Sequence, residues 1–242
     1  MLLLQHIAWG LPEGTEIIRD VSLDIGDNKL VVVTGPNGGG KTTLAKLIAG
    51  IEQPSSGRLI LDGEDITTLD MTQRAQKGIA YAFQQPVRFK GLTVRDLLEL
   101  ASGGELKEAA LCDLLGKVGL CANEYIDREL NASLSGGEIK RIEIASVLAR
   151  HAKLSIFDEP EAGIDLWSFS RLVETFEELR TAGAGTLLVI SHQERILSIA
   201  DEIVVVADGK VRAAGPKDEI LPTLLSEEKT ARCPLGREEA RV

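Results

Sequence analysis

One stretch constrains this chain more than any other: a β-branched strand that runs into a glycine-rich turn and then into a helix. Val31, Val32 and Val33 favour the strand, and residues 44–49 favour the helix. We assign the residues between them to phosphate binding: Gly35, Pro36, Asn37, Gly38, Gly39, Gly40, Lys41, Thr42 and Thr43. Such a loop turns its N–H groups inward, with a lysine for phosphate oxygens and a hydroxyl for Mg²⁺. An ordinary glycine-rich turn with a chance lysine is the alternative, and the order of elements favours the phosphate site.

The composition restricts where this nucleotide site operates. The apolar runs at residues 186–190 and 203–207 are far shorter than the roughly 20 residues that cross a bilayer, so another chain must supply any membrane span. The start lacks the positive region of a signal peptide, and we therefore expect a cytoplasmic location. The net charge of −10 disfavours nucleic acid as a partner.

The three cysteines predict neither a disulfide framework nor a metal site, because they are odd in number and form no C-x-x-C pair. Among them, we expect Cys112 to be a small buried apolar residue and Cys121 and Cys233 to be incidental.

Hydrophobic periodicity predicts an α/β fold. Residues 1–28 alternate like antiparallel strands with hairpin turns, whereas residues 93–150 have helical spacing only. Further strands are expected at residues 58–61, 78–83, 154–157, 186–190 and 202–207, with a helix at 166–180. The strands that alternate with helices favour a mostly parallel, helix-covered sheet with an antiparallel N-terminal part and an inserted helical lobe.

Two acids stand where a buried strand ends, at Asp158 and Glu159. Such a strand end opens on the ligand crevice of an α/β sheet. Asp158 is then a ligand of Mg²⁺, directly or through water, and Glu159 is a base for the attacking water. Acids at a strand end are common by chance, but this pair follows a phosphate-binding loop.

A second candidate anion site lies at Ser135, Gly136 and Gly137, where an N-cap residue and two glycines precede a helix. A plain capped helix is the alternative. Together with the phosphate loop and the strand-end acids, however, this stretch resembles the signature motif of the ABC-type ATPases. The resemblance covers about residues 1–225, as a single domain. It implies a P-loop NTPase fold with a RecA-like core at about 1–86 and 152–225, a helical lobe at about 87–151 and a charged tail at 226–242.

The resemblance also assigns roles to residues outside these motifs. Gln84 resembles the glutamine that contacts Mg²⁺ and water, Asp165 the D-loop aspartate, and His192 the switch histidine at the γ-phosphate. It implies ATP and Mg²⁺ as cofactors. It also implies a head-to-tail dimer with itself, in which Ser135 of one chain closes over ATP bound at Lys41 of the other.

Within the family, the signature helix points to a subgroup. Import ATPases usually read L-S-G-G-Q-x-Q-R, whereas here Glu138, Lys140 and Glu143 stand at divergent places, which is similar to SufC-type ATPases of iron–sulfur cluster assembly. Residues 82–87, 163–165 and 192–197 resemble that subgroup too, while Pro160 and Leu134 depart from it. We therefore expect a SufB/SufD-like scaffold as partner. The alternatives are the ATP-binding subunit of a transporter with a transmembrane permease, and a nucleic-acid-linked ATPase.

Two aromatic residues, Phe89 and Trp9, each have either a binding role or a role in the hydrophobic core. Phe89 lies in the segment 84–91 with Val87, Arg88 and Lys90, and it is either the anchor of a partner-docking surface or a core residue of the lobe. Trp9 either stacks on the adenine ring or fills the core.

Overall fold

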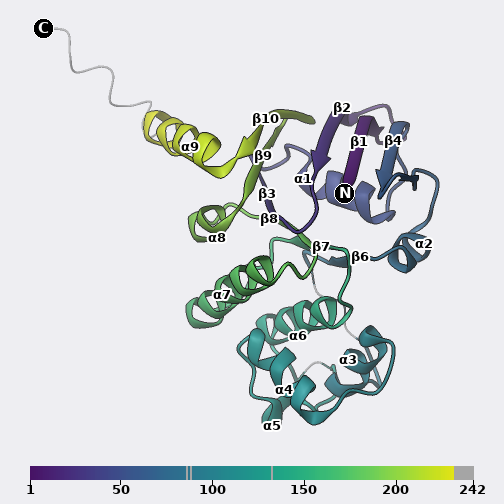
Figure 1. Cartoon of the computed structure of the whole chain (residues 1–242), viewed down its shortest axis with the longest axis vertical. Helices are drawn as coiled ribbons and strands as arrows, with labels where there is room; N and C mark the ends of the chain where they lie inside the picture. Colours follow the sequence, from purple (N-terminus) through teal and green to yellow (C-terminus); the bar gives the residue numbers. More distant parts are fainter. Residues whose placement is uncertain (86, 88, 132, 232–242) are drawn as a thin grey trace, which may run out of the picture.

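The structure, a computed structural model, describes residues 1–85, 87, 89–131 and 133–231. Two β-sheets and a lobe of helices make up this part of the chain (Figure 1). The elements in chain order are β1 (Leu2–Gly10), β2 (Glu16–Ile25), β3 (Leu30–Thr34), α1 (Lys41–Ala49), β4 (Ser56–Leu61), β5 (Glu64–Asp65), α2 (Met71–Gln76), β6 (Ile79–Ala82), α3 (Val94–Ser102), α4 (Glu108–Lys117), α5 (Ala122–Tyr125), α6 (Gly136–Ala149), β7 (Leu154–Asp158), α7 (Leu166–Ala182), β8 (Thr186–Ile190), α8 (Glu194–Ile199), β9 (Glu202–Ala207), β10 (Lys210–Pro216) and α9 (Lys217–Ala231).

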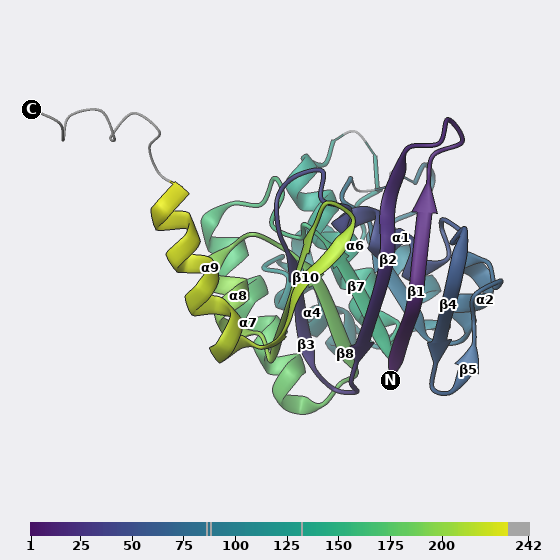
Figure 2. The same cartoon turned by 90° about the horizontal axis from the view of Figure 1, so that it is seen from above.

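The smaller sheet is antiparallel, with strand order β2-β1-β4-β5 (Figure 2). Leu4 of β1 lies opposite Leu23 on one side and opposite Leu59 on the other. All three side chains are buried. The sheet confirms the expected antiparallel N-terminal part and adds β4 and β5 to it.

The larger sheet has the order β10-β9-β3-β8-β7-β6 and is parallel from β9 to β6. Every residue of β3, β7 and β8 is buried, as is typical of parallel strands that are covered on both faces. Since these strands are parallel and adjacent, the segments that follow them meet at one edge of the sheet. These segments carry the phosphate loop, Glu159 and His192.

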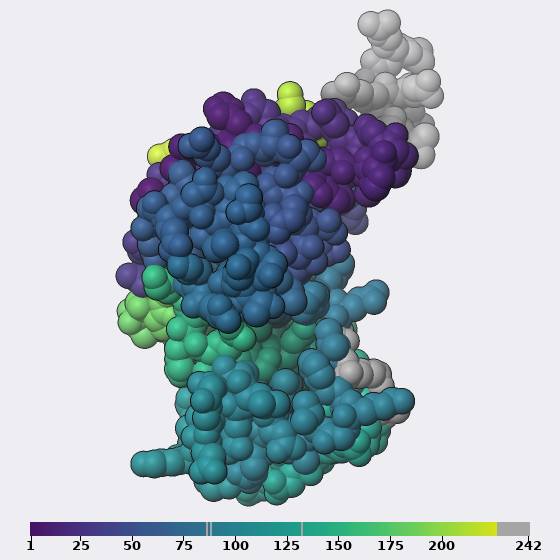
Figure 3. All heavy atoms as spheres, turned by 90° about the vertical axis from the view of Figure 1, so that its right-hand side faces the viewer, coloured from purple at the N-terminus to yellow at the C-terminus, as the bar shows by residue number. Residues whose placement is uncertain are grey.

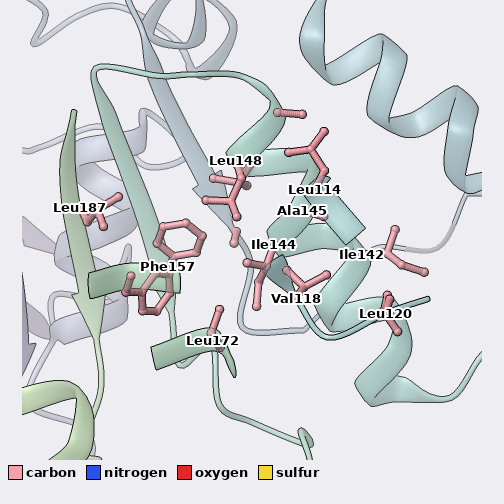
Figure 4. Close-up of a cluster of buried hydrophobic side chains, with 14 of the residues drawn as sticks. Leu114, Val118, Leu120, Ile142, Ile144, Ala145, Leu148, Phe157, Leu172 and Leu187 are labelled. Carbon is pink, nitrogen blue, oxygen red and sulfur yellow. The ribbon is translucent and has the colours of Figure 1, made fainter. Parts of the chain in front are cut away.

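Each face of the larger sheet packs against its own hydrophobic cluster. Val31 and Val33 of β3 join a cluster with α1 and the smaller sheet. Leu30 and Val32, on the opposite face, join a cluster with α6 and α7. Figure 4 shows how this second cluster continues from the sheet into the lobe, from Phe157 and Leu187 on strands to the labelled side chains of α4 and α6.

The lobe consists of α3 to α6 and forms the lower end of the molecule in the space-filling view, where it is mostly teal (Figure 3). Thr93 caps α3 reciprocally with Asp96, and Ser135 caps α6 in the same way with Glu138. Because α3 to α6 lie between β6 and β7 in the chain, they confirm the expected inserted helical lobe. Within the described residues, no helix combines the length and the apolar character that crossing a membrane requires.

Cys112 and the end of α9 differ from the sequence prediction. Cys112 is exposed, so its predicted burial is wrong: the buried face of α4 is formed by Leu111, Leu114 and Leu115, and Cys112 points away from it. Helix α9 extends to Ala231, past the expected start of the tail at residue 226. Residues 232–242, including Cys233, lie outside the described residues.

Candidate active site

The phosphate loop joins β3 to α1, and two glycines set its shape. Gly35 has φ +131°, and a Cβ atom there would lie 2.1 Å from the carbonyl oxygen of Val206, so only glycine fits. Gly40 is the N-cap of α1, with φ 102° and no side chain to cap the helix. No side chain caps the N–H groups in the first turn of α1, so these groups can donate hydrogen bonds to a bound anion.

Lys41 lies inside this loop and is 5% exposed. Its Nζ donates to the carbonyl oxygens of Gly35 (2.8 Å) and Pro36 (3.0 Å). Burial lowers the pKa of Lys41, against the opposing charges of Glu159 and Asp158. The ammonium is thus aimed into the loop, where phosphate oxygens would bind.

Asp158, at the end of β7, joins the phosphate loop to two other elements. Its Oδ1 accepts a hydrogen bond from the Thr42 hydroxyl (3.1 Å), and its Oδ2 accepts one from the Tyr81 hydroxyl (2.9 Å). The side chain is fully buried, and this burial raises its pKa although both hydrogen bonds oppose the shift. The contact of Tyr81 with Asp158 could not be foreseen from the sequence, because it depends on β6 being the neighbour of β7.

Glu159 follows Asp158 with a left-handed backbone (φ 46°), a conformation that costs a residue with a side chain about 1–3 kcal/mol. A hydrogen bond from its N–H to the carbonyl oxygen of Ile190 holds the turn (3.0 Å). The carboxylate accepts a hydrogen bond from Gln84 Nε2 (2.7 Å). The strained turn therefore presents the Glu159 carboxylate to Gln84 at the strand edge.

Lys41, Gln84 and Glu159 line one hollow of about 450 Å³, whereas Asp158 and Tyr81 do not line it. Its lining residues are Ile17, Asn37, Gly38, Gly40, Lys41, Thr42, Thr43, Gln84 and Glu159. The structure thus brings together the phosphate loop, the glutamine and the second strand-end acid. We take this hollow as the candidate triphosphate site.

His192 borders an adjoining hollow of about 620 Å³, together with Gly35, Pro36 and Asn37. Its Nδ1 lies 3.4 Å from the Thr34 hydroxyl. Burial, and then the charge of Lys41, lower the pKa of His192. A neutral imidazole at this place can exchange hydrogen bonds with a phosphate group.

Ser135, Gly136 and Gly137 line neither of these two hollows; they begin α6 on the lobe. Gly137 lies against the segment 160–165 (the D-loop), since a Cβ on Gly137 would be 2.5 Å from the carbonyl oxygen of Gly163. Asp165 caps α7 by accepting from the N–H groups of Trp167 and Ser168, both at 3.0 Å. One copy of the chain therefore holds the two predicted anion sites apart.

Lys140 is a second residue whose place the sequence did not reveal. It is 1% exposed, and its Nζ donates to the carbonyl oxygen of Phe83 and lies 3.4 Å from those of Gln84 and Asp158. The Lys140 ammonium thus links the main-chain carbonyl groups at Gln84 and Asp158. The only sequence signal was its divergence from the glutamine that is usual at this place.

Trp9 is partly buried and packs against the cluster between the two sheets, which favours the core alternative over stacking on adenine. Ile17, on β2, lines the candidate triphosphate site instead. Leu11, two residues after Trp9, is 37% exposed.

Comparison with known protein families shows which family has this arrangement of motifs. A sequence profile of the family described as ABC transporter matches residues 18–162, which include the phosphate loop, Ser135 and Glu159. The chain belongs to the ABC transporter family of ATPases. The expected family and fold are thereby confirmed.

Several relatives of this ABC ATPase are similar along most of their length. An uncharacterized ABC transporter ATP-binding protein of Methanocaldococcus jannaschii is 38% identical over 213 residues, 85% of each chain. The lipopolysaccharide export system ATP-binding protein LptB of Haemophilus influenzae is 32% identical over 229 residues, 92% of each chain. Both are named as transport proteins, which favours the transporter alternative over the SufC-like expectation.

The fold also matches solved structures. A dimeric ATP-binding cassette in a post-hydrolysis state with ADP and phosphate has a TM-score of 0.80, and the match covers 90% of this chain and 99% of that one. At 22% identity this likeness shows the fold alone.

Proposed function

We propose that this ABC ATPase hydrolyses ATP in the hollow beside Lys41 and Glu159, as the ATP-binding subunit of a membrane transport system. The observation that carries the proposal is the convergence of Lys41, Gln84 and Glu159 on that one hollow. The relatives named as transporter proteins support the choice of system.

Mg²⁺ fits the donor set at this place. Thr42 and Gln84 line the hollow, and the Thr42 hydroxyl donates to Asp158 Oδ1 (3.1 Å), which puts that carboxylate directly behind it. Hydroxyl, carboxylate and amide oxygens are the hard ligands that Mg²⁺ prefers. When bound there, the ion would neutralise phosphate charge, as it does in phosphoryl transfer generally.

The protein residues then have separate roles. Lys41 and the first-turn N–H groups of α1 hold the phosphates, and His192 contacts the terminal phosphate from the adjoining hollow. Glu159 accepts a proton from the attacking water. Gln84 Nε2 holds the Glu159 carboxylate in place by donating a hydrogen bond of 2.7 Å to it.

We further propose that two copies close head to tail around ATP. Ser135, Gly136 and Gly137 form an anion site that lies away from Lys41 of their own chain, so a second copy offers the natural ligand. The short segment 160–164 links Glu159 to Asp165, packs against Gly137 through Gly163, and would lie at the middle of the closed dimer. In this arrangement a single chain is incomplete and hydrolyses ATP poorly.

A partner would dock beside Gln84. Val87 and Phe89 are 45% and 39% exposed, and both line a small apolar cavity of about 130 Å³ with Phe83 and Leu97. Half-exposed apolar side chains around a cavity suit an inserted helix of a permease. Arg88, which we also assigned to this surface, lies outside the described residues.

A SufB/SufD-like scaffold remains a second candidate partner, because Glu138, Lys140 and Glu143 of the signature helix are similar to SufC-type sequences. Purifying the native complex and identifying the chain that accompanies the ATPase distinguishes the two. A multi-span permease supports the transporter, and a soluble scaffold supports cluster assembly. The expected cytoplasmic location stays a prediction.

A further inference from the structure

Glu138 places a carboxylate at the anion-binding end of α6. It is the third residue of the helix, and its Oε2 accepts the Ser135 N–H (2.6 Å) while the Ser135 hydroxyl accepts the Glu138 N–H (3.2 Å). At this position the importers of the family usually have glutamine, which carries no charge. The chain thus has a negative charge where it is proposed to receive a phosphate.

Two residues from the segment before the signature motif restrain this carboxylate. The Tyr125 hydroxyl donates to Glu138 Oε1, and Arg128 Nη1 lies 3.9 Å from the same oxygen. The Arg128 guanidinium also lies over the Tyr125 ring, 5.0 Å from its centroid. Hydrogen bonds from Tyr125 and Ser135 lower the pKa of Glu138 to about 2, so the group is charged at neutral pH.

A carboxylate near a helix N-terminus stabilises the helix, but it competes with any other anion for the same positive end. Glu138 already uses the Ser135 N–H, which a phosphate of ATP could otherwise engage. If it swung outward from Tyr125, its charge would face that phosphate directly. Where the carboxylate is held therefore decides how strongly it repels ATP.

We propose that Tyr125 and Arg128 are positioning residues that pin the Glu138 carboxylate as a helix cap and keep its charge away from the ATP on which the signature motif closes. Glu138 then weakens the ATP-bound dimer, and Tyr125 and Arg128 limit that weakening. The inference rests on the proposed function, in which Ser135 acts on ATP bound by a second copy.

The test compares dimer dissociation constants by analytical ultracentrifugation with saturating Mg²⁺–ATP. All chains carry Glu159→Gln to prevent hydrolysis, and the set comprises this parent, Tyr125→Phe, Glu138→Gln and the double variant. Tyr125→Phe should weaken the dimer about fivefold and Glu138→Gln should tighten it about fivefold, within the range of charge effects at helix ends. The double variant should be as tight as Glu138→Gln alone, because an uncharged side chain needs no restraint.

This rescue separates positioning from a merely structural role. If Tyr125 only supports the lobe, Tyr125→Phe weakens the dimer equally with Glu138 or Gln at position 138, and the inference is overturned. No effect of Tyr125→Phe in either background also overturns it. The ATP affinity of the dilute monomer should stay unchanged in Tyr125→Phe. A parent chain that stays monomeric with ATP contradicts the proposed dimer itself, which is a different result from a dimer insensitive to Tyr125.

Discussion

Lys140 and Glu143 show how much of this site depends on buried charge. Glu143 Oε1 accepts the Phe83 N–H (3.0 Å), while Lys140 binds the carbonyl oxygen of the same residue. Lys140 Nζ and Glu143 Oε2 lie 3.8 Å apart. Glu143 Oε2 is buried without a hydrogen-bond partner in the described part of the chain. The pair fixes the backbone just before Gln84.

The titration of Glu143 predicts a pH dependence of stability. Burial raises its pKa to about 7 from an ordinary 4.5, against the opposing charge of Lys140. The folded chain keeps this proton to higher pH than the unfolded chain does, so the contribution to stability is full below about pH 4.5 and is lost as the pH rises through 7. Glu143→Gln removes this loss. Its melting temperature relative to wild type should therefore rise between pH 5 and pH 8, and a constant difference would contradict the assigned pKa.

Base recognition should be weak. Lys41, Thr42 and Thr43 of the candidate triphosphate site are suited to phosphates, and Trp9 packs against the core. We expect GTP to compete with labelled ATP within about tenfold, or 1.4 kcal/mol. A hundredfold preference for ATP would contradict this expectation and reveal a side chain that recognises the adenine base.

For single residues, the sequence predicts those that belong to motifs, because the order of the motifs along the chain identifies them. Lys41, Gln84 and Glu159 do lie around one hollow. Tyr81 and Lys140 could not be predicted, since their contacts with Asp158 depend on which strands are neighbours and on how α6 packs against them.

The signature turn and the D-loop act as one packed element. Arg141 Nη1 donates to the Ser168 hydroxyl (2.5 Å) and to the carbonyl oxygen of Gly119 (3.1 Å), which ties α6 to the start of α7. Gly137 packs directly against Gly163. A change in the signature turn should therefore also move Asp165.

Two neighbouring glycines of this turn allow a matched comparison. A Cβ on Gly137 would lie 2.5 Å from a backbone oxygen, whereas a Cβ on Gly136 would meet nothing within 4 Å. Gly137→Ala should lower the melting temperature by several degrees, since overpacking costs about 1–3 kcal/mol. Gly136→Ala should leave it unchanged or slightly raised, because alanine favours a helix. Equal melting temperatures in a calorimetric scan would contradict the close packing.

The elements themselves were predictable where the apolar pattern is strong. The expected strands at 186–190 and 202–207 match β8 and β9 in both bounds, and the expected helix at 166–180 extends two residues further as α7. Helices α2 and α8 were not assigned, because each spans only six residues. The pairing of β1 with β4 was also missed, since nothing local in the sequence indicates a partner so far along the chain.

In the whole molecule, α6 connects the nucleotide site with the lobe. It packs on the lobe helices and on the larger sheet, and it carries both the signature residues and Lys140 (Figures 1 and 4). A partner bound near Phe89 would therefore touch the same element that holds the Gln84 backbone. This arrangement offers a route by which the nucleotide state reaches a partner.

Phe89 is the residue through which this coupling can be tested. Phe89→Ala should reduce recovery of the partner in a pull-down, because exposed aromatics dominate interface energetics, while the basal ATPase rate is preserved. Leu100→Ala is a suitable control, since Leu100 is 67% exposed and does not line the cavity. Normal recovery with a folded Phe89 variant would exclude the proposed docking surface.

The most direct test of the account is the ATP turnover of Glu159→Gln beside wild type, with ATP affinity measured on both. We predict turnover slower by about 10²–10⁴-fold, with affinity within about threefold and an ATP-bound dimer on size exclusion. Lys41→Ala is the contrasting variant and should lose affinity, because the phosphates lose their buried ammonium. Unchanged turnover in Glu159→Gln would contradict the assignment of Glu159 as the base and, with it, the proposed chemistry of the hollow.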